Sequence, residues 1–159
     1  MTTGSESPAS AWKKLPVQEQ VILSENINKE ALIFPVVECF TSIQGESTHA
    51  GRLCFFIRLA GCNLKCSYCD TVYAQDAAVG SSVTLEEILE EARRSPADLV
   101  ELTGGEPSLH PAAPVLVQAL IAEGFEVLME TNGSVRLDKF PPQLKRIMQL
   151  CSVSADFHL

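Results

Sequence analysis

Residues 54–70 read CFFIRLAGCNLKCSYCD and join a buried strand pattern to a cysteine-rich loop. The first half, 54–59, is a run of aromatic and β-branched residues, which is typical of a β-strand. The second half holds Cys62, Cys66 and Cys69, with three residues between the first pair and two between the second. Thiolates this close together can bind one iron–sulfur cube. Three ligands leave one iron of the cube without a protein donor, and an open metal position favours catalysis over a structural role.

A structural zinc site is the main alternative for these cysteines. Zinc in such sites takes four protein ligands, which usually come from two separated pairs. The other candidates for a fourth ligand are Cys39, Cys54, Cys151, His49, His110 and His158. None of them forms a second closely spaced pair. We interpret the three cysteines in this set as small buried hydrophobic side chains, and the histidines as structural or solvated.

The composition indicates a single globular domain. The chain has 159 residues, of which 46% are hydrophobic, and this length is sufficient for a substantial core. The net charge is −8 without any cluster of lysine or arginine, which argues against a nucleic-acid partner because phosphate binding needs concentrated positive charge. No apolar run reaches the length of a membrane span and no signal segment is recognisable, so we expect a cytoplasmic protein with a small-molecule substrate.

Strand and helix patterns alternate along residues 34–159, which we expect to form the core domain. Strands are predicted at 36–43, 54–59, 98–103, 126–130 and 152–156. Helices are predicted after a capping box at Thr84, between Pro111 and Gly124, and within 137–150. Residues 1–33 are predicted to be a partly disordered extension with a short helix near 17–26. Such alternation is typical of an α/β fold with a mostly parallel sheet.

Polar motifs follow three of the predicted strands where each strand ends. The cysteine loop follows the strand that ends at Leu59, residues 103–107 (TGGEP) follow the next strand, and residues 130–133 (ETNG) follow the third. The C-terminal ends of parallel strands lie at one edge of a sheet, so we expect the three motifs to meet there. The two glycines of TGGEP would let a ligand approach the main chain closely.

Arg58, Thr71 and residues 42–46 (SIQGE) are further candidates for binding. The planar fork of Arg58 could bind a substrate carboxylate through two hydrogen bonds, or the side chain could be a solvated charge at a strand end. Thr71 could bind Mg²⁺ if substrate and water complete the octahedron, or it could be a turn residue. Residues 42–46 are either a binding segment or a polar loop.

With these motifs the chain resembles the radical S-adenosylmethionine (SAM) superfamily and, within it, the 7-carboxy-7-deazaguanine synthase family of queuosine precursor synthesis. The resemblance extends from about Pro35 onward and rests on residues 40–46, 56–66, 69–71, 103–107 and 130–133. It implies a partial (β/α) barrel that is incomplete at the C-terminus, because relatives continue with a segment that closes over the substrate. Ser47 stands where the family usually has glycine, which would change the loop beside the substrate.

The resemblance also implies cofactors, a reaction and site residues. A [4Fe–4S] cluster on the three loop cysteines would reduce SAM to a 5′-deoxyadenosyl radical. The enzyme, a carbon–nitrogen lyase, would convert 6-carboxy-5,6,7,8-tetrahydropterin to 7-carboxy-7-deazaguanine with loss of ammonia. The residues implied to contact SAM are Tyr68, Cys69, Asp70, Gly105 and Ser154. The residues implied to contact the pterin are Ile43, Gln44, Gly45, Arg58 and Thr103, while Thr71 would bind Mg²⁺.

The chain is also expected to have protein partners, and two other functions fit some of the same motifs. The resemblance implies a homodimer and an electron donor such as flavodoxin or ferredoxin. One alternative is a glycyl-radical activase, which would share the cysteines and the double glycine. Such an enzyme acts on a protein backbone and would not need Arg58 or Thr71. The other alternative is a non-catalytic α/β module that binds zinc or senses redox state.

Overall fold

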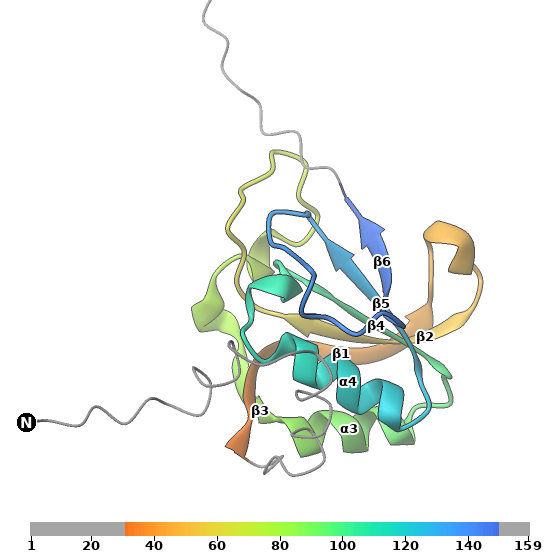
Figure 1. Cartoon of the computed structure of the whole chain (residues 1–159). Helices are drawn as coiled ribbons and strands as arrows, with labels where there is room; N and C mark the ends of the chain where they lie inside the picture. The colour runs from red at the N-terminus through yellow and green to blue at the C-terminus, as the bar shows by residue number, and fades with distance from the viewer. Residues whose placement is uncertain (1–30, 150–159) are drawn as a thin grey trace, which may run out of the picture.

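The structure is a computed structural model that describes residues 31–149, in which six strands form one sheet in the order β3-β1-β2-β4-β5-β6 (Figure 1). The strands are β1 (Ile33–Ile43), β2 (Leu53–Leu59), β3 (Ser81–Thr84), β4 (Leu99–Gly104), β5 (Glu126–Thr131) and β6 (Lys145–Met148). The two α-helices of this part are α3 (Leu85–Arg94) and α4 (Ala113–Ala122). Short 3-10 turns are η3 (Ser47–His49), η4 (Val72–Ala74), η5 (Ala77–Val79) and η6 (Pro107–Leu109).

The sheet is mostly parallel, as predicted. β2, β4, β5 and β6 run parallel to one another, while β1 pairs antiparallel with both β2 and β3. α4 connects β4 with β5, and the path from β2 to β4 passes through the cysteine loop, β3 and α3. Over the described residues the sheet is open, which agrees with a partial barrel.

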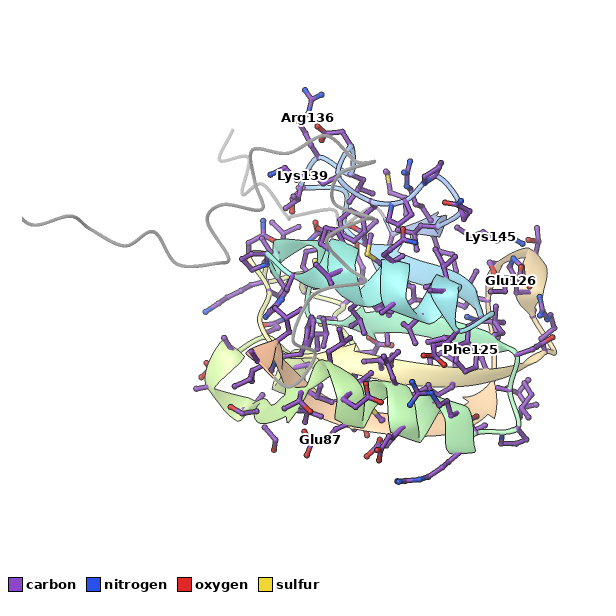
Figure 2. All side chains as sticks on the ribbon, turned by 60° about the horizontal axis from the view of Figure 1, so that its bottom comes forward. Glu87, Phe125, Glu126, Arg136, Lys139 and Lys145 are labelled. Carbon is purple, nitrogen blue, oxygen red and sulfur yellow. The ribbon has the colours of Figure 1, made fainter. Side chains whose placement is uncertain are left out.

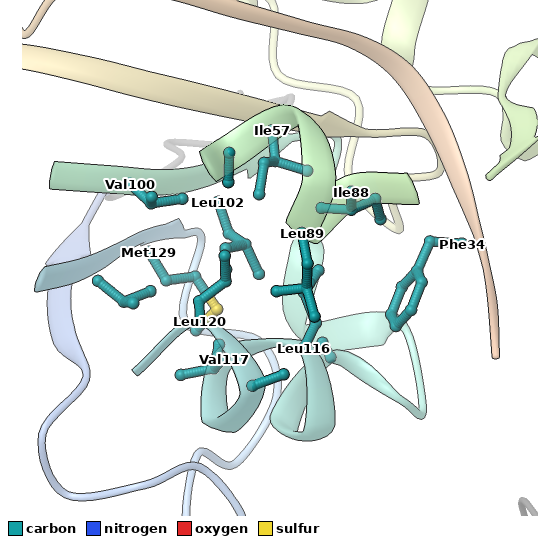
Figure 3. Packing of buried hydrophobic residues seen from close by; sticks show 14 of the residues in the cluster. Phe34, Ile57, Ile88, Leu89, Val100, Leu102, Leu116, Val117, Leu120 and Met129 are labelled. Carbon is teal, nitrogen blue, oxygen red and sulfur yellow. The ribbon is translucent and has the colours of Figure 1, made fainter. Parts of the chain in front are cut away.

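Side chains of the central strands alternate between the two faces of the sheet, as the two-residue period of a strand requires. On one face, Ile57 of β2 and Leu102 of β4 pack against α3 and α4, and the two helices lie on the same side of the sheet (Figures 1 and 3). Phe56, which precedes Ile57 in β2, and Leu128 of β5 belong to a smaller apolar cluster on the opposite face. The helix-covered face therefore supplies the main core, and the other face is left for the polar groups described below.

The capping box predicted at Thr84 is confirmed. Thr84 Oγ1 accepts a hydrogen bond from Glu87 N at 3.2 Å, and Thr84 N donates to Glu87 Oε2 at 2.8 Å. The buried side chains of α3 are Leu85, Ile88, Leu89 and Ala92. The predicted helix before Gly124 is α4, and Gly124 itself has a φ of 95° just beyond the end of that helix.

The helix predicted within residues 137–150 is wrong. Up to Gln149 this stretch forms turns followed by β6, which pairs with β5. Pro141 and Pro142 lack the N–H group that a helix interior needs, so the apolar spacing of this stretch does not lead to a helix. Lys145 instead forms an ion pair with Glu126, which joins the starts of β6 and β5 (Figure 2).

Several predicted features lie outside the described residues. These are the N-terminal extension with its short helix, the strand at 152–156, and the residues Cys151, Ser154 and His158. The proposed division into an extension and a core domain therefore stays a prediction. Among residues 31–149, no helix combines the length and apolar character needed to cross a bilayer.

Candidate functional site

A cavity of about 440 Å³ lies where the parallel strands end, and its lining includes the polar motifs that follow them. This volume is within the range of small-molecule sites. The lining includes these residues singled out from the sequence: Gln44, Gly45, Arg58, Cys62, Cys66, Tyr68, Cys69, Asp70, Thr71, Thr103 and Gly105. In Figure 1 the segment after β2 reaches the C-terminal ends of β5 and β6. The three motifs expected at one edge of the sheet thus meet in one cavity.

Among the described residues that were predicted to bind SAM, substrate or metal, only Ile43 does not line the cavity. It is the last residue of β1 and is 57% exposed. The following residue, Gln44, is buried and does line the cavity. A contact of residue 43 with a ligand would therefore involve its backbone more readily than its side chain.

The cysteine loop begins at the end of β2, and its two sides are joined by backbone hydrogen bonds. Gly61 N donates to Ala74 O at 2.8 Å, and Cys62 N donates to Gln75 O at 3.0 Å. Between Cys62 and Thr71 the chain has neither helix nor strand. The backbone hydrogen bonds therefore hold the loop at its base.

The three loop cysteines are the ligand type and spacing that an iron–sulfur cluster takes. Leu64 N donates to Cys62 Sγ at 3.4 Å, and Thr71 Oγ1 lies 3.8 Å from Cys69 Sγ. Both sulfurs thus have a polar neighbour within the cysteine loop. Cys62, Cys66 and Cys69 all line the cavity, although no three ligand side chains converge on one point within residues 31–149.

Cys39 and Cys54 behave as the apolar residues that the sequence predicts. Cys54 is fully buried, and Cys39 packs partly buried against the main core. Burial raises the pKa of each thiol to about 12, since a buried thiolate loses its hydration. Neither thiol is ionised at neutral pH, which makes both poor candidates for a metal ligand.

The two glycines of the GGEP loop (residues 104–107) allow this loop to pack on the backbone of the cysteine loop. Gly105 N donates to Leu59 O at 2.9 Å, and Glu106 N donates to Gly61 O at 2.8 Å. A Cβ on Gly105 would collide with the carbonyl oxygen of Gly61, and Gly104 has a φ of 124°. The close approach that these glycines permit is between two loops of the protein, and an approach of ligand to the same backbone stays a prediction.

We expect Gly105→Ala to reduce the free energy of unfolding by about 2–3 kcal/mol, because the new methyl group meets backbone that cannot rotate away. Gly45→Ala is the matched control, since a Cβ at Gly45 meets nothing within 4 Å and its φ is not positive. Chemical denaturation followed by circular dichroism compares the two variants. Equal stabilities of the two would contradict the packing described for Gly105.

Glu106 joins the GGEP loop to the ETNG loop (residues 130–133), a role that its place in the sequence does not indicate. Its side chain is buried, with the residue only 2% exposed. Glu106 Oε1 accepts from Thr131 Oγ1 at 2.8 Å and from Ser108 N at 3.0 Å, while Oε2 accepts from Asn132 N at 2.6 Å. A buried carboxylate with these donors fixes both loops at the cavity.

Two carboxyl groups, Glu101 of β4 and Glu130 of β5, line the cavity. Glu101 is 1% exposed and accepts a hydrogen bond from Gln44 Nε2. Glu130 Oε2 accepts from Thr103 Oγ1 at 2.7 Å. Burial raises the pKa of Glu101 to about 8, with a further contribution from the charge of Glu130. At neutral pH the Glu101 carboxyl is therefore mainly protonated. Its only sequence signal was a carboxylate inside an apolar strand.

The raised pKa of Glu101 predicts a stability that falls as pH rises. The folded state keeps this proton up to about pH 8, whereas the unfolded chain loses it near its ordinary value of 4.5. The contribution is fully present below the ordinary value and is lost as pH rises toward 8. Glu101→Gln removes this titration. We therefore expect the Tm of the variant to rise relative to the Tm of the unchanged chain as the pH increases from about 5 to about 8. Parallel pH profiles for the two proteins would contradict the protonation of Glu101.

The guanidinium of Arg58 is held between a carboxylate and two aromatic rings. Arg58 Nε donates to Glu38 Oε1 at 2.8 Å, and Tyr73 OH donates to the same oxygen at 2.8 Å. Arg58 Cζ lies 5.8 Å from the ring centres of both Phe40 and Tyr73, within the range of cation–π contacts. The side chain of Arg58 is 14% exposed, which does not fit the alternative of a solvated charge. Glu38 and Tyr73 were missed because only the fold brings them to Arg58.

An α/β sheet whose cysteine loop, GGEP loop and ETNG loop share one cavity is the arrangement expected of radical SAM proteins. The family model of the Radical SAM superfamily matches residues 56–154, which is more than half of the chain. The chain therefore belongs to the radical SAM superfamily.

Within this superfamily the chain resembles 7-carboxy-7-deazaguanine synthases. It is 43% identical over 122 residues to that of Hyperthermus butylicus, covering 76% of this chain and 52% of the relative. It is 41% identical over 120 residues to that of Chlorobaculum tepidum, covering 76% and 54%. The crystal structure of QueE from Escherichia coli matches with a TM-score of 0.66 at 25% identity, covering 76% of this chain and 61% of that chain. The chain spans about half the length of the curated relatives it matches.

Proposed function

We propose that this chain is a 7-carboxy-7-deazaguanine synthase or the cluster-binding part of one, a carbon–nitrogen lyase that acts on 6-carboxy-5,6,7,8-tetrahydropterin with loss of ammonia. The observation that carries the proposal is the meeting of the three loops in one cavity that also includes Arg58. The names and identities of the relatives support the same assignment.

Cys62, Cys66 and Cys69 hold a [4Fe–4S] cluster in this proposal. Together with SAM, the bound cluster would supply a 5′-deoxyadenosyl radical for hydrogen abstraction from the substrate. Tyr68, Asp70 and Gly105 lie on the cavity lining with Cys69, and we assign them to SAM binding. Ser154, which lies outside the described residues, is assigned the same role from the resemblance alone.

Arg58 binds the substrate carboxylate in this proposal. Its hydrogen bond to Glu38 uses Nε, and this contact together with the two aromatic rings fixes the plane of the guanidinium before the substrate arrives. The cavity residues Gln44, Gly45 and Thr103 bind the pterin ring, with Ile43 taking part through its backbone. Thr71 would offer its hydroxyl to Mg²⁺, which prefers oxygen ligands.

The remaining parts of the proposal concern partners. A flavodoxin or ferredoxin delivers the electron, the chain acts as a homodimer, and the reaction takes place in the cytoplasm. A glycyl-radical activase is less well supported, because its protein-backbone substrate offers no carboxylate to the nearly buried Arg58.

The test is an anaerobic reaction with reconstituted chain, dithionite, SAM, Mg²⁺ and ring-deuterated 6-carboxytetrahydropterin, followed by mass spectrometry. We expect 7-carboxy-7-deazaguanine together with deuterated 5′-deoxyadenosine. Deuterium in 5′-deoxyadenosine without product would place the substrate in the site but show that this chain does not complete the reaction. Formation of 5′-deoxyadenosine free of deuterium would contradict the substrate assignment.

A further inference from the structure

We infer that the side-chain amide of Asn132 donates a hydrogen bond to the sulfur of Cys62 and thereby raises the reduction potential of the bound cluster. Asn132 follows β5 in the ETNG loop, and its Nδ2 lies 3.9 Å from Cys62 Sγ. The inference rests on the proposed function, because it requires the cluster to be bound through Cys62. It adds to that function a residue that positions a donor at the cluster without ligating iron.

The orientation of the Asn132 amide is assigned from its other hydrogen bonds. Ser134 N donates to Asn132 Oδ1 at 2.9 Å, so the nitrogen must be on the opposite side of the amide. Asn132 Nδ2 lies 3.2 Å from Asn63 Oδ1, an acceptor in the cysteine loop. An amide nitrogen has two N–H groups. One serves Asn63, and the second is available to the sulfur of Cys62.

Asn132 is held in this place by the buried carboxylate of Glu106. Asn132 N donates to Glu106 Oε2 at 2.6 Å, and Thr131 Oγ1 donates to Glu106 Oε1 at 2.8 Å. Gly133 N in turn donates to Thr131 Oγ1 at 3.1 Å. The backbone on both sides of Asn132 is therefore fixed, and its side chain reaches the cysteine loop from a rigid support.

A donor at a cluster sulfur stabilises the reduced cluster more than the oxidised one, because reduction adds negative charge that is shared by the sulfurs. Leu64 N also donates to Cys62 Sγ, at 3.4 Å, and it belongs to the cysteine loop itself. Asn132 differs because it comes from the end of β5. If Asn132 served only to tie two loops together, its replacement would change stability but not the potential.

Two variants of Asn132 and one matched control test the inference. Asn132→Ala removes the donor, and Asn132→Asp keeps the acceptor for Ser134 N but replaces the donor by a charged oxygen. Ser134→Ala is the control, since the Ser134 hydroxyl bonds to Asn63 in the same network. A redox titration monitored by electron paramagnetic resonance (EPR) is made on each reconstituted protein. At a fixed potential we expect the ratio of reduced to oxidised cluster to fall about tenfold in Asn132→Ala, equivalent to about 59 mV for one electron.

The ratio should fall further in Asn132→Asp and stay unchanged in Ser134→Ala. Unaltered potentials in both Asn132 variants, with full iron and sulfide content, would overturn the inference and leave the proposed function in place. Failure of the unchanged chain to bind iron and sulfide would overturn both. If both variants lose the cluster, the contact is tested in chain that has the wild-type Asn132 and is labelled with ¹⁵N only in asparagine side-chain amides. The measurement is the hyperfine coupling between ¹⁵N and the reduced cluster. A ¹⁵N coupling to the reduced cluster that persists in Asn63→Asp, which removes the labelled amide next to Cys62, supports the contact. The absence of a coupling in Asn63→Asp overturns the contact.

Discussion

Replacement of Cys69 by alanine is expected to lower bound iron from about four atoms per chain to near zero. Three thiolates on one loop are the whole protein ligand set of the proposed cluster, so two of them cannot retain it. Reductive cleavage of SAM should fall at least about 1,000-fold with the cluster lost. Iron and sulfide analysis after anaerobic reconstitution measures the first effect, and 5′-deoxyadenosine formation measures the second.

Cys39→Ala is the matched control for this experiment. Cys39 packs partly buried against the core, and burial raises the pKa of its thiol to about 12, so the variant should keep its iron. Equal loss of iron in both variants, with secondary structure intact by circular dichroism, would argue against the assigned ligands. One zinc per unchanged chain without iron or sulfide would favour the zinc module instead.

Replacement of Arg58 by glutamine is expected to reduce formation of 7-carboxy-7-deazaguanine by about 100- to 1,000-fold, because the substrate carboxylate loses its charged, bidentate partner. Cleavage of SAM without substrate should change only a few-fold, since Arg58 is assigned to the substrate and is not a ligand of the cluster. Arg58→Lys keeps the charge without the planar fork and should recover less than about a tenth of the activity. Product and 5′-deoxyadenosine are measured separately by mass spectrometry.

Arg52→Gln provides the control for Arg58. Arg52 forms ion pairs with Glu126 at 2.6 Å and Asp98 at 3.1 Å, at the start of β2 rather than at its end. Its loss should leave turnover nearly unchanged. Full pterin turnover by Arg58→Gln would refute the substrate role of Arg58, and activation of a partner protein by that variant would favour the glycyl-radical activase.

Features that depend on neighbours in the sequence were predictable. The Thr84 capping box and the three motifs at strand ends need only a few consecutive residues, and the parallel topology then brings the motifs to one edge. The cysteine loop was predictable in the same way, because its ligand spacing is local.

Features that depend on long-range contacts were not predictable from one sequence. Glu101, Glu106 and Asn132 take their roles from partners in other strands and loops, and nothing in their own segments indicates those partners. The helix prediction for the stretch after residue 137 was wrong for a related reason. Pairing with β5 determines β6, whereas the spacing of its apolar residues alone suggests a helix.

EPR spectroscopy of the reduced, reconstituted chain with and without SAM tests most directly whether the cysteine loop and its cavity form a radical SAM site. We predict the signal of a reduced [4Fe–4S] cluster, with g-values that change when SAM is added, because SAM binds the iron that lacks a protein ligand. A cluster signal that SAM leaves unaltered, or a reconstituted chain without any cluster signal, would contradict this assignment.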